Sequence, residues 1–293
     1  MRQALVSLVA LVFATSLYAH RDGGVNMSIS FDDEGNAADC SGLRVRIGGE
    51  RAAVVSEDIP FHGSALKISA EHGHGGIRVI GNRGGSYRVS LCKAVAPGAD
   101  AAGIRAVLAG NEISAQGPEN EKWVAYFIVS APRGASLDLR STNGPISVSD
   151  FNGTLEAEAV NGPVSVKESS GTITARTTNG PVSIKGGSGE VKLQATNGPV
   201  SVKLDGTTWD GTLDASTRNG PVTLAMPRGF RSGVLVEASG GPVSCRGEAC
   251  SGQRYNRFED DDHGRLRRLE FGSGPQVVRL STVNGPVTVR ENE

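Results

Sequence analysis

The sequence predicts an all-β protein whose main part is a single-stranded β-solenoid, a parallel β-helix-like stack of 18–22-residue coils. The tripeptide Asn-Gly-Pro recurs at a short period, and a degenerate copy begins at Gly240. The first three intervals are 18 residues each, and the next two are 22 and 21. Such a period holds two strands and two turns, which is typical of stacked β coils. The full copies begin at Asn143, Asn161, Asn179, Asn197, Asn219 and Asn284.

Both strands of each coil alternate with a period of two residues. In the third coil, Val182 and Ile184 lie three and five positions after the Asn, and Ser183 lies between them. Every coil has a hydroxyl residue at this middle position, and apolar residues recur six and four positions before each Asn. Alternate residues of a strand face the same side, so we expect the apolar positions to be buried and the hydroxyls to be exposed.

The Asn-Gly dipeptides predict the turn that joins the two strands of a coil. Both residue types adopt positive φ at low cost, and the Pro that follows opens a strand where its missing N–H does least harm. Parallel stacking would align the Asn side chains in a ladder. An antiparallel sandwich of hairpins is the alternative, although in-register columns favour parallel stacking. The turn glycines are Gly144, Gly162, Gly180, Gly198, Gly220 and Gly285.

The repeated Asn-Gly turns, together with the closing Gly-Ser-Gly-Pro and Leu-Ser-Thr-Val-Asn-Gly-Pro-Val-Thr-Val segments of residues 272–289, carry a resemblance to a known family. They resemble the bacterial putative-adhesin family of β-strand-repeat proteins, which has a domain of unknown function. The resemblance covers residues 130–293 well and the earlier region loosely. It implies export and an interaction with the surface or envelope. Its motif is structural, so it assigns no catalytic residue, and this chain departs from it in the Pro that follows nearly every Asn-Gly.

The chain is expected to have three parts. Residues 1–19 combine the basic Arg2 with an apolar run, which predicts a secretory signal peptide and a mature chain that begins near His20. Residues 20–130 carry short alternating segments and are expected to form an irregular β region that caps the stack. Residues 131–293 hold the repeat, with a loop insertion at about 246–264. The protein is therefore expected in the periplasm, on the cell surface or in the medium, without a membrane span.

The four cysteines predict two disulfide bonds, since an even number is typical of exported proteins. Three pairings are open, and Cys40–Cys92 with Cys245–Cys250 is favoured because each bridge then stays within one region. Four free thiols are the alternative. The spacing of the second pair is poor for zinc.

Two clusters are candidates for metal binding. His62, His72 and His74 lie close in sequence, but the glycines around them also fit a solvated loop. The run from Glu259 to His263 offers oxygen ligands for calcium, but it lacks the spacing of a known calcium loop, so a solvated acidic loop is favoured. No cofactor is expected.

A candidate ligand stripe follows from three lysines that share one position in consecutive coils. Lys167, Lys185 and Lys203 lie six positions after the Asn, where later coils have Arg246 and Arg290. Such a stripe would meet phosphates or acidic sugars; alternatively, it keeps the sheet soluble. Trp209, in the coil with the 22-residue interval, is a candidate sugar platform, or else covers the edge of the core.

These observations favour an exported, non-enzymatic interaction protein of the cell envelope that binds a glycan or another protein. The formal net charge of −1 argues against a nucleic-acid partner. A polysaccharide-active β-helix enzyme is the first alternative, but the position five before each Asn reads Asp138, Glu156, Thr174, Lys192 and Asp214, with no lasting carboxylate cluster. A purely structural envelope protein is the second.

Overall fold

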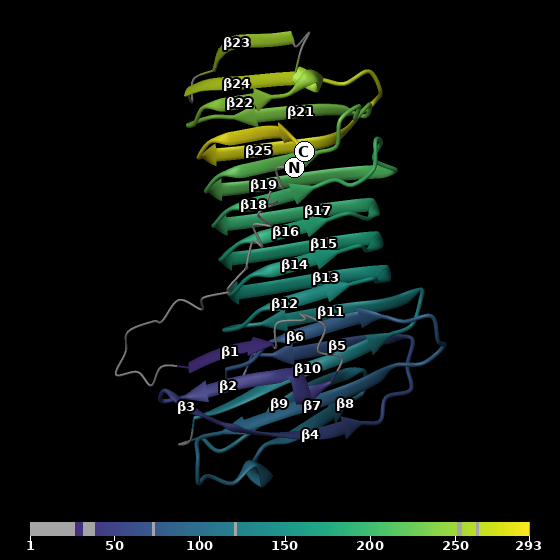
Figure 1. Ribbon diagram of the computed structural model, residues 1–293, viewed down its shortest axis with the longest axis vertical. Coiled ribbons are helices and arrows are strands. Elements are labelled where there is room, and N and C mark those ends of the chain that lie inside the picture. Colours follow the sequence, from purple (N-terminus) through teal and green to yellow (C-terminus); the bar gives the residue numbers. More distant parts are fainter. Residues whose placement is uncertain are drawn as a thin grey trace, which may run out of the picture.

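The computed structural model describes residues 27–31, 39–71, 74–119, 122–250, 254–261 and 264–292. It is all-β, with three sheets and three short 3-10 helices, η1 (Cys40–Gly42), η2 (Ala101–Gly103) and η3 (Glu248–Cys250). Two long sheets run the length of the molecule, and their inward residues share one core (Figure 1). The predicted signal peptide lies outside the described residues.

The eleven-stranded sheet takes the strand that follows each Asn-Gly-Pro. Its order in space is β22 (Val243–Arg246), β26 (Val287–Glu291), β20 (Val222–Met226), β18 (Val200–Lys203), β16 (Val182–Lys185), β14 (Val164–Lys167), β12 (Ile146–Ser149), β6 (Ile77–Gly81), β10 (Trp123–Ala131), β7 (Arg88–Val95) and β4 (Ala53–Ile59).

The twelve-stranded sheet takes the strand that precedes each Asn. Its order is β23 (Arg254–Asp261), β24 (Gly264–Phe271), β21 (Gly233–Ala238), β25 (Gln276–Asn284), β19 (Gly211–Asn219), β17 (Ser188–Asn197), β15 (Ser170–Asn179), β13 (Asn152–Asn161), β11 (Ala135–Ser141), β5 (Ala65–Ala70), β9 (Glu112–Gln116) and β8 (Arg105–Ala109).

The repeat strands pair in parallel and in register, apart from an irregularity between Gly233 and Val234 where β21 pairs with β25. Val182 pairs with Val164 on one side and Val200 on the other, and the same holds for Ser183 between two serines. The apolar positions are buried as predicted, for example Val182 and Ile184. The hydroxyl residues between them were expected to be exposed, but most of them, including Ser183, are half-buried. Both sheets are open and keep two edges. At the edge strand β22, Val243 and Cys245 are only half-buried because no further coil covers them.

The coils do not follow one another in space as they do in sequence. Sequence order places the coil of Gly240 between those of Asn219 and Asn284, but β25 lies between β19 and β21 (Figure 1). The outer edge of β21 pairs instead with β24 in antiparallel fashion. The chain therefore returns on the inner side of β21, and its last repeat is inserted into the stack.

The segment expected to be a projecting loop, residues 246–264, contains a strand. β23 pairs with β24 in antiparallel fashion and forms the last strand of the twelve-stranded sheet. Its sequence has few apolar residues, so the strand could not be predicted from apolar alternation. Backbone hydrogen bonds to β24 hold it in place. The acidic run from Glu259 to His263 includes residues whose side chains lie outside the described part of the structure.

The Asn ladder is present at one corner of the stack. Each Asn after Asn143 donates a hydrogen bond from Nδ2 to the Oδ1 of the Asn in the preceding coil of the stack, at 2.9–3.1 Å. The ladder follows the order in space, since Asn284 donates to Asn219. It stops at Gly240, which has no side chain and lies against Asn284.

The expected reason for the Asn-Gly turn is wrong in one respect, since none of these Asn residues has a positive φ. The left-handed region is occupied at the opposite corner, at Asp150, Glu168 and Gly186, which share one position in successive coils. At the Asn-Gly corner, Gly180 and Gly220 have a nearly extended φ of 159° and 158°. Glycine is needed at the Asn-Gly corner for another reason. A Cβ on Gly198 would lie 2.0 Å from the carbonyl oxygen of Gly180, because the backbones stack directly on one another.

We expect Asn179→Ala to lower the free energy of unfolding by about 1–2 kcal/mol, because it removes two hydrogen bonds of the ladder at an exposed position. The neighbouring Thr178→Ala is the control, since Thr178 is exposed and makes no side-chain hydrogen bond within the described residues. It should stay within about 0.5 kcal/mol of the wild type. Denaturant midpoints measure both, and equal values would show that the ladder adds nothing to stability.

The N-terminal strands continue the stack in the opposite direction from the last repeat. β5 and β6 pair in parallel with β11 and β12, so they repeat the register of the later coils. Beyond them β7, β4 and β8 pair in antiparallel fashion. At this end of the stack, β4 is the last strand of the eleven-stranded sheet and β8 is the last strand of the twelve-stranded sheet.

A third sheet of β1 (Met27–Phe31), β2 (Leu43–Ile47) and β3 (Glu50–Arg51) packs on the outer side of β7 and β10. A second hydrophobic cluster fills this contact, and the Cys40–Cys92 disulfide crosses it. Cys245 and Cys250 form the other disulfide. The pairing favoured from the sequence is the one in the structure.

Candidate functional site

The strongest candidate for a binding surface is a column of basic side chains on the eleven-stranded sheet. Lys167 pairs in register with Lys185, and Lys185 with Lys203, on the neighbouring strands β14, β16 and β18. Arg290 on β26 and Arg246 on β22 pair with each other two strands further on. All five side chains are exposed. We call these five residues the basic column.

One strand interrupts the basic column. On β20 the corresponding residue is Ala225, which pairs with Lys203 and Arg290 and is buried. A hollow of about 630 Å³ lies at this end of the column, lined by Lys203, Arg246, Gly247, Arg290, Glu291 and Asn292. Three cations therefore surround one depression, with Glu291 as its acidic member.

The lysines of the basic column have no described carboxylate within ion-pair distance. Glu168 follows Lys167 in sequence, but its carboxylate lies over the backbone of Gly186. Neighbouring parallel strands lie ~4.8 Å apart, so the column places like charges directly opposite one another. Such pairs are destabilising unless something neutralises them.

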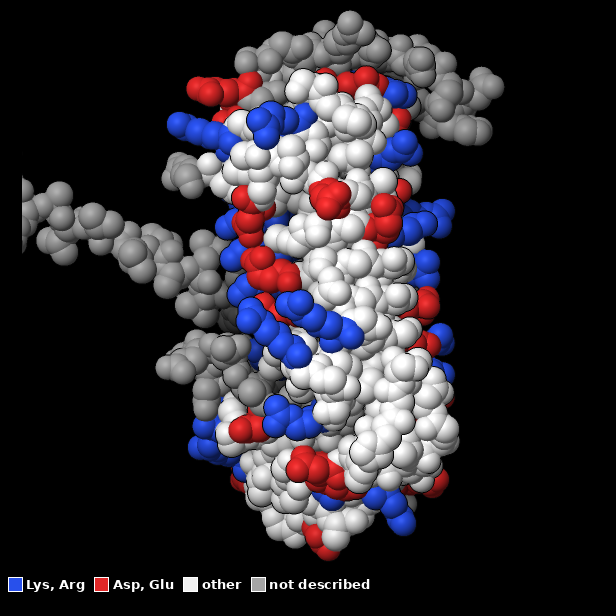
Figure 2. Space-filling view, turned by 90° about the vertical axis from the view of Figure 1, so that its right-hand side faces the viewer, with Lys and Arg blue, Asp and Glu red and all other residues white. Residues whose placement is uncertain are grey.

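The outer face of the twelve-stranded sheet balances its charges instead. Arg140 bonds to Asp138 on the same strand at 3.1 Å, and Arg176 reaches Glu156 on the neighbouring strand at 3.3 Å. The hydrogen bond with Asp138 raises the pKa of the Arg140 guanidinium. Figure 2 shows charged side chains along both flanks of one side of the stack, with a largely uncharged strip between them.

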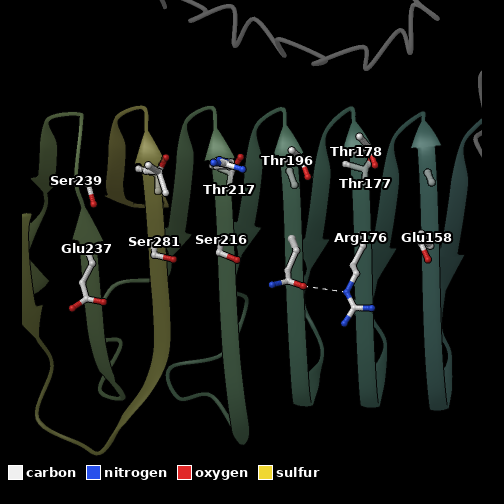
Figure 3. A pocket seen from close by; sticks show the side chains of 16 residues that line it. Glu158, Arg176, Thr177, Thr178, Thr196, Ser216, Thr217, Glu237, Ser239 and Ser281 are labelled. Atoms are coloured by element: carbon white, nitrogen blue, oxygen red, sulfur yellow. Dashed lines mark hydrogen bonds between the residues drawn. The ribbon is translucent and has the colours of Figure 1, made fainter. Parts of the chain in front are cut away.

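A shallow groove of about 780 Å³ crosses the twelve-stranded sheet beside the Asn corner. Glu237, Ser281, Ser216, Arg176 and Glu158 form a row along its length, one from each of five strands, and threonines line its side (Figure 3). Arg176 donates from Nε to Oε1 of Gln194 at 3.1 Å. The groove is polar and of mixed sign, and no single charge dominates it.

Trp209 does not belong to the exposed stripe. Its side chain is 6% exposed and lies in the main core, and its Nε1 donates to the carbonyl oxygen of Gly189 at 3.1 Å. The backbone N–H of Trp209 donates to Oγ of Ser232. The residue thus covers the edge of the core, which is the alternative stated from the sequence, and it offers no platform to a sugar.

The metal candidates gain no support from the structure. His62 and His74 are exposed, and His72 lies outside the described residues. Within the described residues no three His, Cys, Asp or Glu side chains come close enough to hold a metal ion.

Sequence reasoning missed the groove and the hollow. The groove arises because the residues at one column, three positions before each Asn, vary in size from Ser216 to Arg176. The hollow depends on the inserted last repeat, which brings Arg290 beside Lys203 across Ala225. Reading the column position at Ala225 would have shown the interruption, but only the order of coils in space shows what surrounds it.

No protein-family model and no curated protein matches the sequence. Solved structures match at low similarity. A putative cell adhesion protein from Clostridium sporogenes has 10% identity and a TM-score of 0.29, with 82% of this chain and 100% of that chain covered. A putative adhesin from Bacteroides fragilis has 10% identity and a TM-score of 0.37, with 82% and 97% covered. A putative adhesin from Parabacteroides merdae has 11% identity and a TM-score of 0.26, with 82% and 96% covered.

At these TM-scores the similarity carries no argument about this chain. Among the described residues, no helix has the length and apolar character needed to cross a membrane.

Proposed function

We propose that this protein is an exported, non-enzymatic interaction protein of the cell envelope, and that its stack is a two-walled β-solenoid that displays a binding surface. The observation that carries the proposal is the basic column, in which five exposed cationic side chains lie in register on one sheet. A rigid array of like charges is suited to a partner of opposite charge, because it binds without ordering its own backbone.

The two disulfides support export. Disulfides persist in oxidising compartments such as the periplasm and the extracellular space, and they are rare in the bacterial cytosol. Cys40 and Cys92 are both buried and join the third sheet to the stack. We therefore propose a location in the periplasm, on the surface or in the medium.

The geometry of the groove argues against a glycosidase site built on its two glutamates. Glu158 on β13 and Glu237 on β21 lie at opposite ends, with β15, β17, β19 and β25 between them. Five strand steps place their backbones roughly 24 Å apart, given the spacing of parallel strands. Glycosidases need their two carboxyl groups about 5–9.5 Å apart. This pair therefore cannot act together on one glycosidic bond.

The test is a binding and turnover assay of the mature protein on a glycan array and on fractionated envelope material. We expect retention of an anionic envelope component, elution by salt, and loss of retention in Lys167→Gln/Lys185→Gln/Lys203→Gln. Turnover of a polysaccharide by pure protein would overturn the non-enzymatic assignment. Absence of binding to every fraction would contradict the proposal and favour a purely structural role.

A further inference from the structure

We propose that the basic column binds a linear acidic polysaccharide, a polyuronate chain that lies along the axis of the stack. The inference rests on the proposed function and names the class of partner for that surface. It is carried by the spacing of the five cations, by the absence of a neutralising partner for the lysines among the described residues, and by the chemistry of the described aromatic residues.

The spacing of the column matches a polymer with one charge per unit. From β14 to β22 the strands follow the order β14, β16, β18, β20, β26, β22, and all but β20 contribute a cation. Five strand steps span roughly 24 Å. A polyuronate carries one carboxylate on each sugar, so an extended chain presents anions at regular short intervals along a line. Several carboxylates of one chain would meet several cations of one column.

The free energy of this array favours an anionic partner. Lys167, Lys185 and Lys203 repel one another across neighbouring strands, and no described carboxylate relieves this repulsion. Solubility alone does not require a row of unpaired lysines. The other sheet also exposes charged side chains, and these form pairs such as Arg176 with Glu156. A bound polyanion would neutralise the column and release counterions, which is favourable at low salt.

The hollow beside Ala225 gives one end of the chain a more specific contact. Arg246 and Arg290 lie on adjacent strands there, with Lys203 across the gap. The planar guanidinium group binds a carboxylate through two parallel hydrogen bonds, which an ammonium group cannot do. The hollow therefore suits the carboxylate of a uronate.

The aromatic residues exclude the main alternatives. Every aromatic side chain that the structure describes is buried, including Trp123, Trp209 and Phe230. Binding of single-stranded nucleic acid relies on exposed aromatic side chains on which bases stack. Neutral sugars also stack on such side chains. The described surface therefore has no aromatic platform for single-stranded nucleic acid or for neutral sugars. It does have exposed charged side chains.

The experiment measures binding of the full mature chain to polygalacturonate fragments of defined length over a salt series. We expect Lys167→Gln/Lys185→Gln/Lys203→Gln to weaken binding at least about tenfold and to lower the slope of log K against log salt by about 2–3. The matched control is Lys192→Gln/Arg218→Gln/Arg279→Gln, which removes three exposed cations from the other sheet. It should change the affinity less than about twofold, and both variants should melt as the wild type does.

Three results would overturn the inference. The first is an equal loss in the control, which would mean that only net charge matters. The second is equal or tighter binding of a single-stranded oligonucleotide or of phosphatidylglycerol vesicles. The third is no binding of polygalacturonate by a protein that still retains envelope material, in which case the proposed function stands without this partner. If neither polygalacturonate nor envelope material binds, both proposals fail.

Discussion

Val182→Asp should lower the free energy of unfolding by more than about 4 kcal/mol at neutral pH, or prevent folding. Val182 is fully buried and lies between Val164 and Val200 in the wall of the core. An unpaired carboxylate there loses its hydration, and the flanking valines offer it no hydrogen bond. Thermal unfolding followed by circular dichroism measures the effect.

The variant should also lose less stability in acid. Burial raises the pKa of a carboxyl group in the folded state above its unfolded value, because it disfavours the charged form. The free energy of unfolding of the variant is therefore highest below the unfolded pKa, where the carboxyl group is protonated in both states. It falls as the pH rises through the folded pKa. The difference between variant and wild type should therefore shrink from pH 7 to pH 4.

Ser183→Asp is the matched control, one residue further along the same strand. Ser183 is half-buried and points to the other side of the sheet, between Ser165 and Ser201. A carboxylate there stays in contact with water, so we expect a loss below about 1 kcal/mol. Similar losses for the two variants would mean that the apolar and hydroxyl columns do not face as described.

Much of this fold could be predicted because the same sequence pattern recurs in every coil. In each strand that follows Asn-Gly-Pro, apolar residues alternate with a hydroxyl residue, as at Val182, Ser183 and Ile184, and a shift of one residue would expose the whole apolar face. The Asn ladder follows from the same register. The disulfide pairing was favoured because each bridge stays within one region, and this reasoning also needs no knowledge of how coils are arranged in space.

The order of the coils could not be predicted in this way. Each coil presents nearly the same edge to its neighbours, so the repeat fits either order of the last two coils. The antiparallel pairing of β24 with β21 decides it, and β24 carries no Asn-Gly-Pro unit. The hollow of the basic column depends on that order, since Arg290 pairs with Ala225 only because the last repeat is inserted. The repeat therefore indicated the basic residues of the column, including Arg246 and Arg290, but not the hollow between them and Lys203.

Gly198→Ala should destabilise the stack by about 2–4 kcal/mol, although alanine is normally the less costly residue in an ordered segment. Its Cβ would lie 2.0 Å from the carbonyl oxygen and 2.6 Å from the carbonyl carbon of Gly180, and both belong to the backbone of the adjacent coil. That backbone cannot move alone, because it stacks on Gly162 in the same way. Gly85→Ala is the control, since a Cβ there meets nothing within 4 Å, and it should leave the denaturant midpoint nearly unchanged. If Gly198→Ala proved as stable as Gly85→Ala, close stacking of backbones would not be the reason for glycine at this corner.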